Sequence, residues 1–330
     1  MPLQRPTYHD VVEARNFIQN YLPKTPLVYV WSLSQMLGCN YYIKCENFQP
    51  VGAFKVRGGV YLVGTLSDDE KRVGVISAST GNHGQSLAFA GRLFGVRVVI
   101  YAPQKDVNPM KLQAMRNLGA EVRLHGKDFD EAREKAEQIA QQEGFRYVHP
   151  ANEPKLIAGV GTMGLEIFED LPDVDVIIVP IGGGSSACGN GIVAKHINPK
   201  VQIIGCQSER APAVWHAWKE HHLKPYPKME TEHEGLATRV PFELTTSILW
   251  DVLDDFILLS DEEINDAICL LSQHAKVVAE GAGAASLAAA IKLKERLRGK
   301  KVVGIVSGGN IPMERYAAVL SGRISRKFSE

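Results

Sequence analysis

Short runs of valine and isoleucine recur along this chain, and longer amphipathic stretches separate them. In the first half, strand-like runs occupy residues 41–45, 73–76, 96–101 and 121–124. In the second half, similar runs occupy residues 174–179, 201–206, 256–259 and 301–306. Most of these runs are almost continuously apolar rather than alternating, which is typical of parallel strands buried on both faces.

Helical patterns fill the intervals between these runs. They predict helices at residues 55–63, 81–94, 109–118, 129–142, 261–274 and 284–296. Thr7 and Asp10 form a capping-box pattern for an earlier helix that reaches about residue 20. This alternation predicts an α/β fold with parallel-type sheets flanked by helices. The polar segment 225–241 is expected to be a surface excursion.

Length and composition narrow the class of protein. A chain of 330 residues exceeds one comfortable core, so two domains are expected. The 37 basic residues balance the 37 acidic ones, which argues against binding to nucleic acid or to an anionic membrane surface. Residues 1–6 lack the apolar part of a secretory signal, and no run is long enough to span a bilayer. The five cysteines are scattered and never spaced C-x-x-C, so reduced thiols in a cytoplasmic protein are expected.

One lysine has unusual surroundings. Lys55 follows the run 41–45 and lies among glycines and small apolar residues in the segment 51–59. Partial loss of water pushes such an amine toward its neutral, nucleophilic form, which a Schiff-base lysine needs. The alternative is an ordinary lysine that extends to solvent from the first turn of a helix.

Three further segments follow a strand-like run within three residues: 79–83, 182–185 and 307–310. The first two also begin a helix, and the exposed amides and positive end of a helix form an anion site. The structural alternatives are an ordinary helix cap at residues 79–83, a tight turn at 182–185 and a capped strand end at Ser307.

In this order and spacing, the four segments resemble those of the fold-type II enzymes that use pyridoxal 5'-phosphate (PLP), a fold similar to that of the tryptophan synthase β chain. The strongest resemblance is to the group of serine/threonine dehydratases (threonine ammonia-lyases) and serine racemases, and it covers about residues 25–310. It implies a small α/β domain at residues 52–150, inserted into a large PLP-binding domain formed by residues 1–51 and 151–330. It also implies PLP as the cofactor.

The resemblance assigns a role to each segment. It implies that Lys55 forms the Schiff base with PLP and then takes the substrate α-proton, while Phe54 packs beside the cofactor ring. Asn82 would face the phenolic oxygen of the cofactor, and Ser307 its pyridine nitrogen. The implied phosphate-binding residues are Gly182, Gly183, Gly184 and Ser185. The implied residues for the substrate carboxylate are Ser79, Thr80, Gly81, Asn82 and His83, with the backbone of His83 more important than its ring.

The chain departs from the family pattern at four positions. Ala53 and Gly59 stand where serine and alanine are usual, and Ser185 replaces the last of four glycines. Ala53 puts one hydrogen bond near the cofactor in doubt, whereas the Ser185 hydroxyl offers an extra one to the phosphate. Thr80 stands where serine racemases carry a serine that acts as acid and base on the face opposite the lysine. Threonine keeps the hydroxyl with a stiffer rotamer, so racemisation stays possible but weakened.

Two other patterns concern functions that are not expected for this chain, namely dinucleotide binding and divalent-metal binding. Residues 159–164 match the dinucleotide pattern G-x-G-x-x-G, but no strand precedes them, so close helix packing is expected instead. Some family members bind a divalent cation after the strand matched here by residues 201–206. Gln207 and Ala213 replace carboxylates there, and Glu209 alone is a poor ligand set, so no divalent metal is expected.

The sequence therefore predicts a PLP-dependent lyase that eliminates the β-hydroxyl of L-threonine or L-serine, giving a 2-oxo acid and ammonia. Its partner would be a small amino-acid substrate, not nucleic acid or a membrane, and a homo-oligomer (dimer or tetramer) is expected by resemblance. A serine racemase, or a dehydratase of another 3-hydroxy amino acid, is the alternative. The remote alternative is a non-catalytic protein that keeps this fold for binding. Absence of cofactor absorbance in the purified protein would indicate this alternative.

Overall fold

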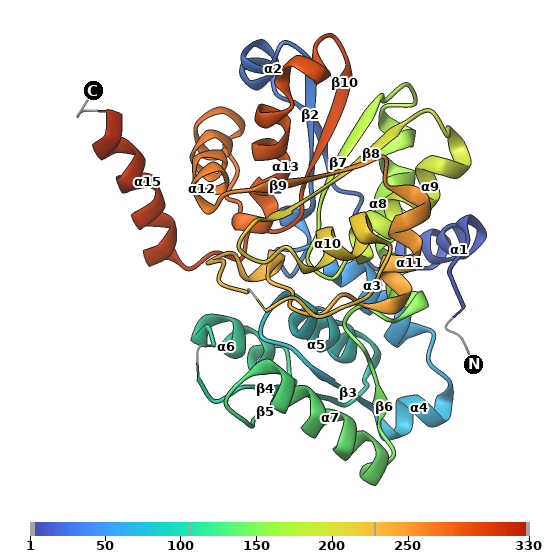
Figure 1. Ribbon diagram of the computed structural model, residues 1–330. Coiled ribbons are helices and arrows are strands. Elements are labelled where there is room, and N and C mark those ends of the chain that lie inside the picture. The colour runs from blue at the N-terminus through green and yellow to red at the C-terminus, as the bar shows by residue number, and fades with distance from the viewer. Residues whose placement is uncertain (1–3, 106, 228, 328–330) are drawn as a thin grey trace. The chain divides into compact units, whose positions relative to one another are not determined.

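The computed structural model describes residues 4–105, 107–227 and 229–327. Residues 1–3, part of the N-terminal segment considered above, lie outside this range. The chain divides into two compact units (Figure 1). Unit 1 comprises residues 1–23 and 49–160, and unit 2 comprises residues 24–48 and 161–330. The division into domains at 52–150 and at 1–51 with 151–330 stays a prediction.

Unit 1 contains a parallel sheet with the strand order β5-β4-β3-β6 among the described residues. Its strands are β3 (Val75–Ala78), β4 (Val98–Ala102), β5 (Glu121–Leu124) and β6 (Arg146–Tyr147). Its helices are α1 (Tyr8–Ile18), α3 (Lys55–Gly64), α4 (Asp68–Val73), α5 (Asn82–Phe94), α6 (Pro109–Asn117) and α7 (Phe129–Glu143). The sheet lies between α5 and α7 (Figure 1), and small α7 residues such as Ala136 pack against Ile76 and Val99.

Unit 2 contains a sheet with the order β1-β2-β10-β7-β8-β9 among the described residues. Its strands are β1 (Leu27–Tyr29), β2 (Asn40–Cys45), β7 (Val176–Pro180), β8 (Gln202–Ser208), β9 (Asp255–Leu259) and β10 (Lys301–Val306). All neighbours pair in parallel except β1, which is antiparallel to β2 at the edge.

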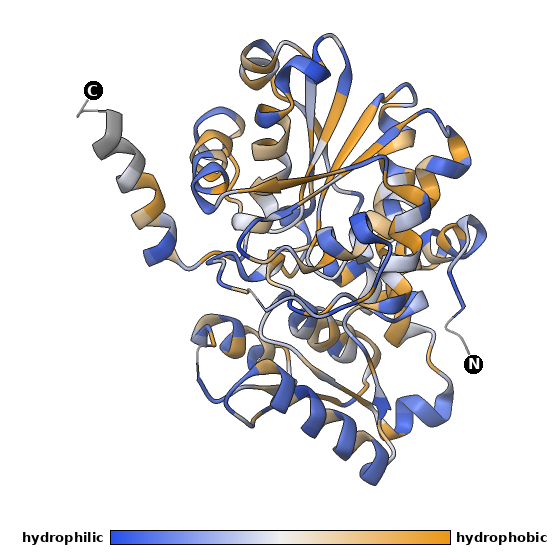
Figure 2. Cartoon of the chain, in the orientation of Figure 1, coloured by the Kyte–Doolittle hydropathy of each residue, from blue (hydrophilic) through white to orange (hydrophobic). Residues whose placement is uncertain are grey.

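Helices cover both faces of the unit 2 sheet (Figure 1). They are α2 (Trp31–Leu37), α8 (Pro154–Asp170, which begins in unit 1), α9 (Ser185–Ile197), α10 (Ala213–Glu220), α11 (Glu243–Val252), α12 (Asp261–Leu270), α13 (Gly281–Lys292), α14 (Lys294–Leu297) and α15 (Met313–Lys327). One-turn 3-10 helices span Glu46–Phe48 and Glu234–Leu236, and a π turn spans Leu271–Ala275. Figure 2 shows apolar strands β7 and β8 inside unit 2 and a largely hydrophilic α7 in unit 1.

The α/β fold with parallel-type sheets is confirmed, and several details of the sequence prediction are corrected. Val73 ends α4 rather than beginning a strand, and the predicted helix 261–274 changes into the π turn after Leu270. The expected surface excursion at residues 225–241 is wrong in its middle, because His233 and Leu236 are buried. The motif 159–164 lies inside helix α8, and a Cβ on Gly159 would lie 2.8 Å from the Arg57 carbonyl oxygen, so close helix packing is confirmed there.

Candidate active site

Lys55 begins helix α3, and Phe54 precedes it as the capping residue. The Lys55 Nζ atom lies 5.2 Å from the centre of the Phe54 ring. The Lys55 carbonyl oxygen accepts a hydrogen bond of 2.7 Å from Ser86 Oγ on α5. A Cβ on Gly59 would lie 2.1 Å from the same Ser86 oxygen. Glycine at position 59 therefore lets α3 and α5 pack closely, and that packing fixes the start of α3.

The turn of residues 79–83 joins β3 to α5 in unit 1. Ser79 Oγ accepts hydrogen bonds from the N–H groups of Gly81 (3.2 Å) and Gly84 (2.8 Å). A hydroxyl that accepts two hydrogen bonds keeps its own hydrogen as a donor. Among the predicted residues, Ser79 and His83 are buried, and the half-buried ones are Thr80, Gly81 and Asn82. The first N–H groups of a helix have no acceptor within the helix, so this turn suits a carboxylate.

One buried histidine, His83, and one half-buried histidine, His149, lie near Lys55 in unit 1. Burial, then repulsion from Lys55 and His149, lowers the pKa of His83 to about 3. Burial lowers the pKa of His149 to about 4; Glu137 opposes this shift, and the positive charges of Arg133 and then Lys55 add to it. Ser77 Oγ donates to the Val148 carbonyl (2.7 Å), so it accepts from His83 Nε2–H at 3.0 Å. Both imidazoles are therefore neutral at pH 7, and the His83 ring serves as a hydrogen-bonded support.

These histidines predict a pH dependence of stability. Below about pH 6.5 the unfolded chain takes up protons that the folded chain excludes until about pH 4. We therefore expect the free energy of unfolding to fall as the pH is lowered through this window. In the folded chain, His149 Nδ1 accepts hydrogen bonds from the N–H groups of Ala151 (3.0 Å) and Asn152 (2.8 Å). The side-chain oxygen of an asparagine can accept the same hydrogen bonds. His149→Asn should therefore flatten the slope by about 1.4 kcal/mol per pH unit.

Urea unfolding of the cofactor-free protein between pH 4 and pH 7 measures this slope. His9→Asn is the matched control, because the His9 side chain is 81% exposed. An unchanged slope in the His149 variant would show that this ring is protonated in the folded chain.

In unit 2, the glycine turn joins β7 to α9. Gly184 has φ +93° and is the capping residue of α9, a conformation that favours glycine. A Cβ on Gly182 would lie 2.3 Å from the Gly235 carbonyl oxygen. Ser185 begins α9 and is buried. Ser186 Oγ is also buried and has no hydrogen-bond partner within the described part of the chain. A helix start with an unsatisfied buried hydroxyl is suited to a phosphate.

Gly182→Ala should weaken phosphate binding at this turn, because the new methyl group displaces the backbone of the turn from Gly235. We expect the dissociation constant of the phosphate-bearing ligand to rise at least about tenfold, which corresponds to the loss of one charge-assisted hydrogen bond. Fluorescence titration of the protein with this ligand measures the effect. Gly322→Ala is the control, since a Cβ there meets nothing within 4 Å. Unchanged affinity of the Gly182 variant would contradict this role of the turn.

Ser307 follows the last residue of β10 and is buried. Strands β10 and β7 are parallel neighbours, with Gly304 opposite Ile178. The glycine turn and Ser307 therefore lie at the same edge of the unit 2 sheet, at the carboxyl ends of adjacent strands. Ligands of α/β sheets bind at such edges.

A second cluster of polar side chains in unit 2 consists of Glu232, His233 and Asp261, whose ligand atoms lie within 4.8 Å of one another. Asp261 Oδ1 accepts hydrogen bonds from Thr231 (2.7 Å) and Ser208 (2.9 Å). These hydroxyls lower the pKa of Asp261 against the opposing effect of burial. Asp261 Oδ2 also accepts a hydrogen bond from the Glu232 N–H at 3.2 Å, so Asp261 anchors the segment around residue 232.

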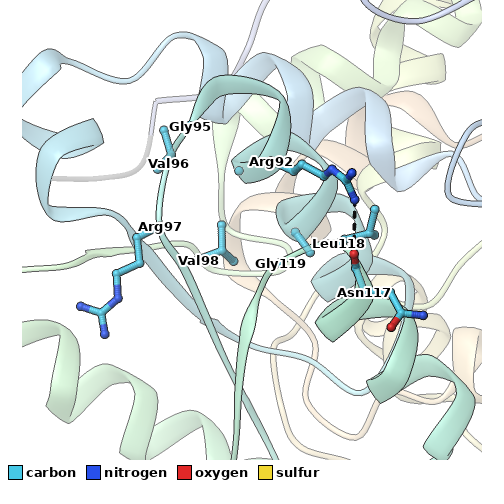
Figure 3. Close-up of a pocket in the computed structure, with 10 residues that line it drawn as sticks. Arg92, Gly95, Val96, Arg97, Val98, Asn117, Leu118 and Gly119 are labelled. Carbon is cyan, nitrogen blue, oxygen red and sulfur yellow. Dashed lines mark hydrogen bonds between the residues drawn. The ribbon is translucent and has the colours of Figure 1, made fainter.

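A pocket of about 480 Å³ lies in unit 1, but none of the predicted site residues line it. Arg92 donates to the Asn117 carbonyl oxygen at its edge, whereas Arg97 points away from Arg92 (Figure 3). Val96 and Val98 place the pocket at the amino end of β4. The Ser79 turn lies at the opposite, carboxyl end of the same sheet. The pocket is therefore distinct from the candidate site.

The structure places the predicted residues as two groups, one in each unit. Lys55 and residues 79–83 belong to unit 1, and residues 182–185 and Ser307 belong to unit 2. The sequence prediction did not include His149, whose pKa is lowered in part by Lys55. No local pattern identifies it, because His149 follows β6, which pairs with β3 over a long sequence separation.

Comparison with known proteins gives this arrangement a family. Residues 18–308 match the family described as pyridoxal-phosphate dependent enzymes. The L-threonine ammonia-lyase of Thermotoga maritima is 40% identical over 96% of this chain and 78% of its own length. A catabolic L-threonine dehydratase of Staphylococcus aureus is 38% identical over 94% of this chain and 91% of its own. The structure of maize serine racemase superimposes with a TM-score of 0.91 and 29% identity, over 98% of this chain and all of that one. The chain therefore belongs to the family of pyridoxal-phosphate dependent enzymes.

Proposed function

We propose that this protein is a PLP-dependent ammonia-lyase that converts L-threonine or L-serine into a 2-oxo acid and ammonia. The observation that carries this proposal is the 40% identity to an L-threonine ammonia-lyase over 96% of the chain. The reaction is balanced without another reactant, because the water lost from the β-carbon is consumed again when ammonia is released.

The residues present fit the cofactor. The glycine turn and the start of α9 offer amides and the unsatisfied Ser186 hydroxyl to a phosphate. Gly182, Gly183, Gly184 and Ser185 are proposed to hold that phosphate. Phe54 and Asn82 are proposed to contact the ring, and Lys55 to attach the cofactor covalently. When bound, PLP withdraws electrons from the substrate α-carbon and so acidifies its proton.

Ser307 is proposed to face the ring nitrogen. A neutral hydroxyl would not stabilise a protonated ring nitrogen as a carboxylate would, so electron withdrawal by the ring would be weaker. Weak withdrawal favours prompt loss of a β-substituent over long-lived carbanions. This property supports elimination rather than amino-group transfer.

The remaining steps belong to the chain's own residues. Ser79, Thr80, Gly81, Asn82 and His83 are proposed to hold the substrate carboxylate. Binding of the carboxylate would hold the α-carbon beside the Lys55 amine. The amine would then remove the α-proton as a general base. The neutral His83 and His149 rings leave this proton transfer to the lysine.

Racemisation of serine is the second candidate activity, favoured by the likeness to maize serine racemase. Thr80 is proposed to supply the hydroxyl that returns a proton to the α-carbon from the face opposite Lys55. Its side chain is half-buried in the turn. Thr80→Ala would then abolish formation of the D-isomer and leave oxo-acid formation in place.

Proton NMR of the holoenzyme with L-threonine in heavy water tests the proposal. We expect the signals of 2-oxobutanoate to grow and those of threonine to disappear. Loss of the α-proton signal without any oxo acid would instead show racemisation or another true substrate. No change with L-threonine or L-serine would overturn the proposed function.

The cellular setting is part of the proposal. Within the described residues, no helix combines the length and apolar character needed to cross a membrane. We propose a cytoplasmic homo-oligomer, a dimer or a tetramer, that acts on a free amino acid. Light scattering of the purified holoenzyme measures the assembly state, and a monomer would contradict this part.

A further inference from the structure

Asp261 lies at the same edge of the unit 2 sheet as the glycine turn. It begins α12 two residues after the end of β9, at the carboxyl end of that strand. Strand β9 is parallel to β8, and β8 is parallel to β7, whose carboxyl end leads into the glycine turn. The Asp261 side chain is only 5% exposed, and a carboxylate is costly to bury without hydrogen-bond donors. The positions of its donors therefore indicate its role.

These donors come from the end of β8 and from the segment 231–236. Ser208 Oγ and Thr231 Oγ1 donate to Asp261 Oδ1 at 2.9 and 2.7 Å. The Glu232 N–H donates to Asp261 Oδ2 at 3.2 Å. Both carboxylate oxygens are thus used, and they join the start of the segment 231–236 to the edge of the sheet.

The other end of this segment contacts the glycine turn. A Cβ on Gly182 would lie 2.3 Å from the Gly235 carbonyl oxygen and 3.7 Å from Leu236 Cα. Leu236 is completely buried in the core of unit 2. The one-turn helix Glu234–Leu236 makes the connection short. A displacement of the segment at Asp261 should therefore also displace Gly235 from the turn.

We infer that Asp261 is a positioning residue for the cofactor phosphate, an inference that rests on the phosphate-binding role proposed for the glycine turn. Asp261 holds the segment 231–236, and the Gly235 carbonyl in turn holds Gly182 in place. Donors that are fixed in advance bind an anion more tightly than donors that must first be ordered. Loss of the Asp261 carboxylate should therefore weaken binding of the phosphate group and leave the contacts of the cofactor ring unchanged.

The test compares PLP with pyridoxal, which lacks the phosphate, as ligands of the full chain after removal of the cofactor. We expect Asp261→Ala to lower the preference for PLP over pyridoxal about tenfold in fluorescence titrations, which corresponds to one charge-assisted hydrogen bond. Asp261→Asn should restore part of this preference, because its side-chain oxygen can still accept hydrogen bonds from Thr231 and Ser208. The asparagine variant also serves as the test if the alanine variant does not fold.

A double variant tests the route through Gly182. Gly182→Ala already displaces the turn from Gly235, so adding Asp261→Ala should lower the preference for PLP little further. Fully additive losses would show that Asp261 does not act through this contact, and they would overturn the inference.

Asp254→Ala is the matched control. Asp254 also anchors backbone in unit 2, because it accepts the Ile203 N–H and binds Lys195 Nζ, each at 2.7 Å. It precedes β9 directly, at the amino end of the sheet, so its loss should leave the preference for PLP unchanged.

Two results of the titrations would overturn the inference. Equal losses of affinity for PLP and pyridoxal in the Asp261 variants would show that Asp261 only supports the fold. Unchanged affinities for both ligands would show that Asp261 has no role in binding. The ligand preference is independent of the proposed elimination, which fails separately if the unmodified protein forms no oxo acid.

Discussion

Replacing Lys55 with alanine should lower the rate of oxo-acid formation from L-threonine at least about thousandfold. General-base catalysis alone contributes about 10²–10⁴-fold, and the variant also loses the amine that attaches the cofactor. The start of α3 is fixed by the Ser86 hydrogen bond to the Lys55 backbone and by the close approach at Gly59, so the fold should survive the substitution. The rate is measured by the release of 2-oxobutanoate at saturating substrate.

A second readout separates attachment of the cofactor from its binding. Borohydride reduction followed by mass spectrometry should add the mass of the cofactor to the peptide that contains Lys55, and the alanine variant should gain none. Lys127→Ala is the control, since that lysine lies on the surface of the same unit. A Lys55 variant with more than a tenth of the original rate would contradict the role of the lysine as base.

The sheets were predictable because strands that are buried on both faces are apolar at almost every position. Strand β10 spans the expected residues 301–306, and the five residues of β7 are all buried. Errors arose where local capping outweighed hydrophobicity. Val73 is apolar, but the Ser67 capping box begins α4, and Gly74 with φ +102° ends that helix. The run of apolar residues therefore begins as a helix and continues as β3.

Short elements at the edge of the sheet have a weaker sequence pattern. Strand β1 has only three residues, none of them buried, and this apolar run is too short to predict a strand by itself. It exists because its backbone pairs with β2, with Val28 opposite Ile43. Helix α2, of seven residues, follows it directly and is too short for a clear period. Pairing with β2 therefore stabilises β1 at the edge of the sheet.

The sequence motifs predicted a candidate site. Residues 79–83, 182–185 and Ser307 were selected because glycine and hydroxyl residues at strand ends suit anion binding, and their roles stay a prediction. His149 was not selected, because its nearness to Lys55 comes from the pairing of strands that are distant in the sequence.

Breaking the buried ion pair of unit 2 should destabilise the protein by about 3–5 kcal/mol. Lys44 Nζ donates to Glu166 Oε2 at 2.7 Å and to the Thr25 carbonyl oxygen at 2.6 Å. The two charged side chains are 0% and 1% exposed. Thr25 Oγ1 in turn donates to the buried Glu46 at 2.6 Å. Lys44→Met leaves the Glu166 carboxylate buried without its cation, which is the costly step. Urea unfolding followed by tryptophan fluorescence measures the loss.

The matched control is the adjacent surface pair. Lys24 binds Glu169 and Asp170 at 2.9 and 2.7 Å, but its side chain is 35% exposed, so Lys24→Met should cost less than about 1 kcal/mol. The double variant Lys44→Met/Glu166→Gln should be less destabilised than the sum of its single changes, because the uncompensated charge is gone. Strict additivity would show that the two side chains do not interact.

The position of this network explains why charges are kept in the core. The chain passes between the units at three points, after Pro23, after Phe48 and after Val160. Thr25 and Glu46 lie within three residues of the first two points, and Glu166 follows the third by six residues on α8. Apolar side chains would fill the same volume without fixed partners, whereas hydrogen-bonded charges accept one geometry.

The ion pair therefore anchors, inside unit 2, all three segments that lead to unit 1. Lys44→Met should loosen these segments before it unfolds either sheet. Amide hydrogen exchange should accordingly rise first at residues 24–28 and 161–166 in this variant, and a uniform rise over the β7 and β10 strands would contradict the anchoring role.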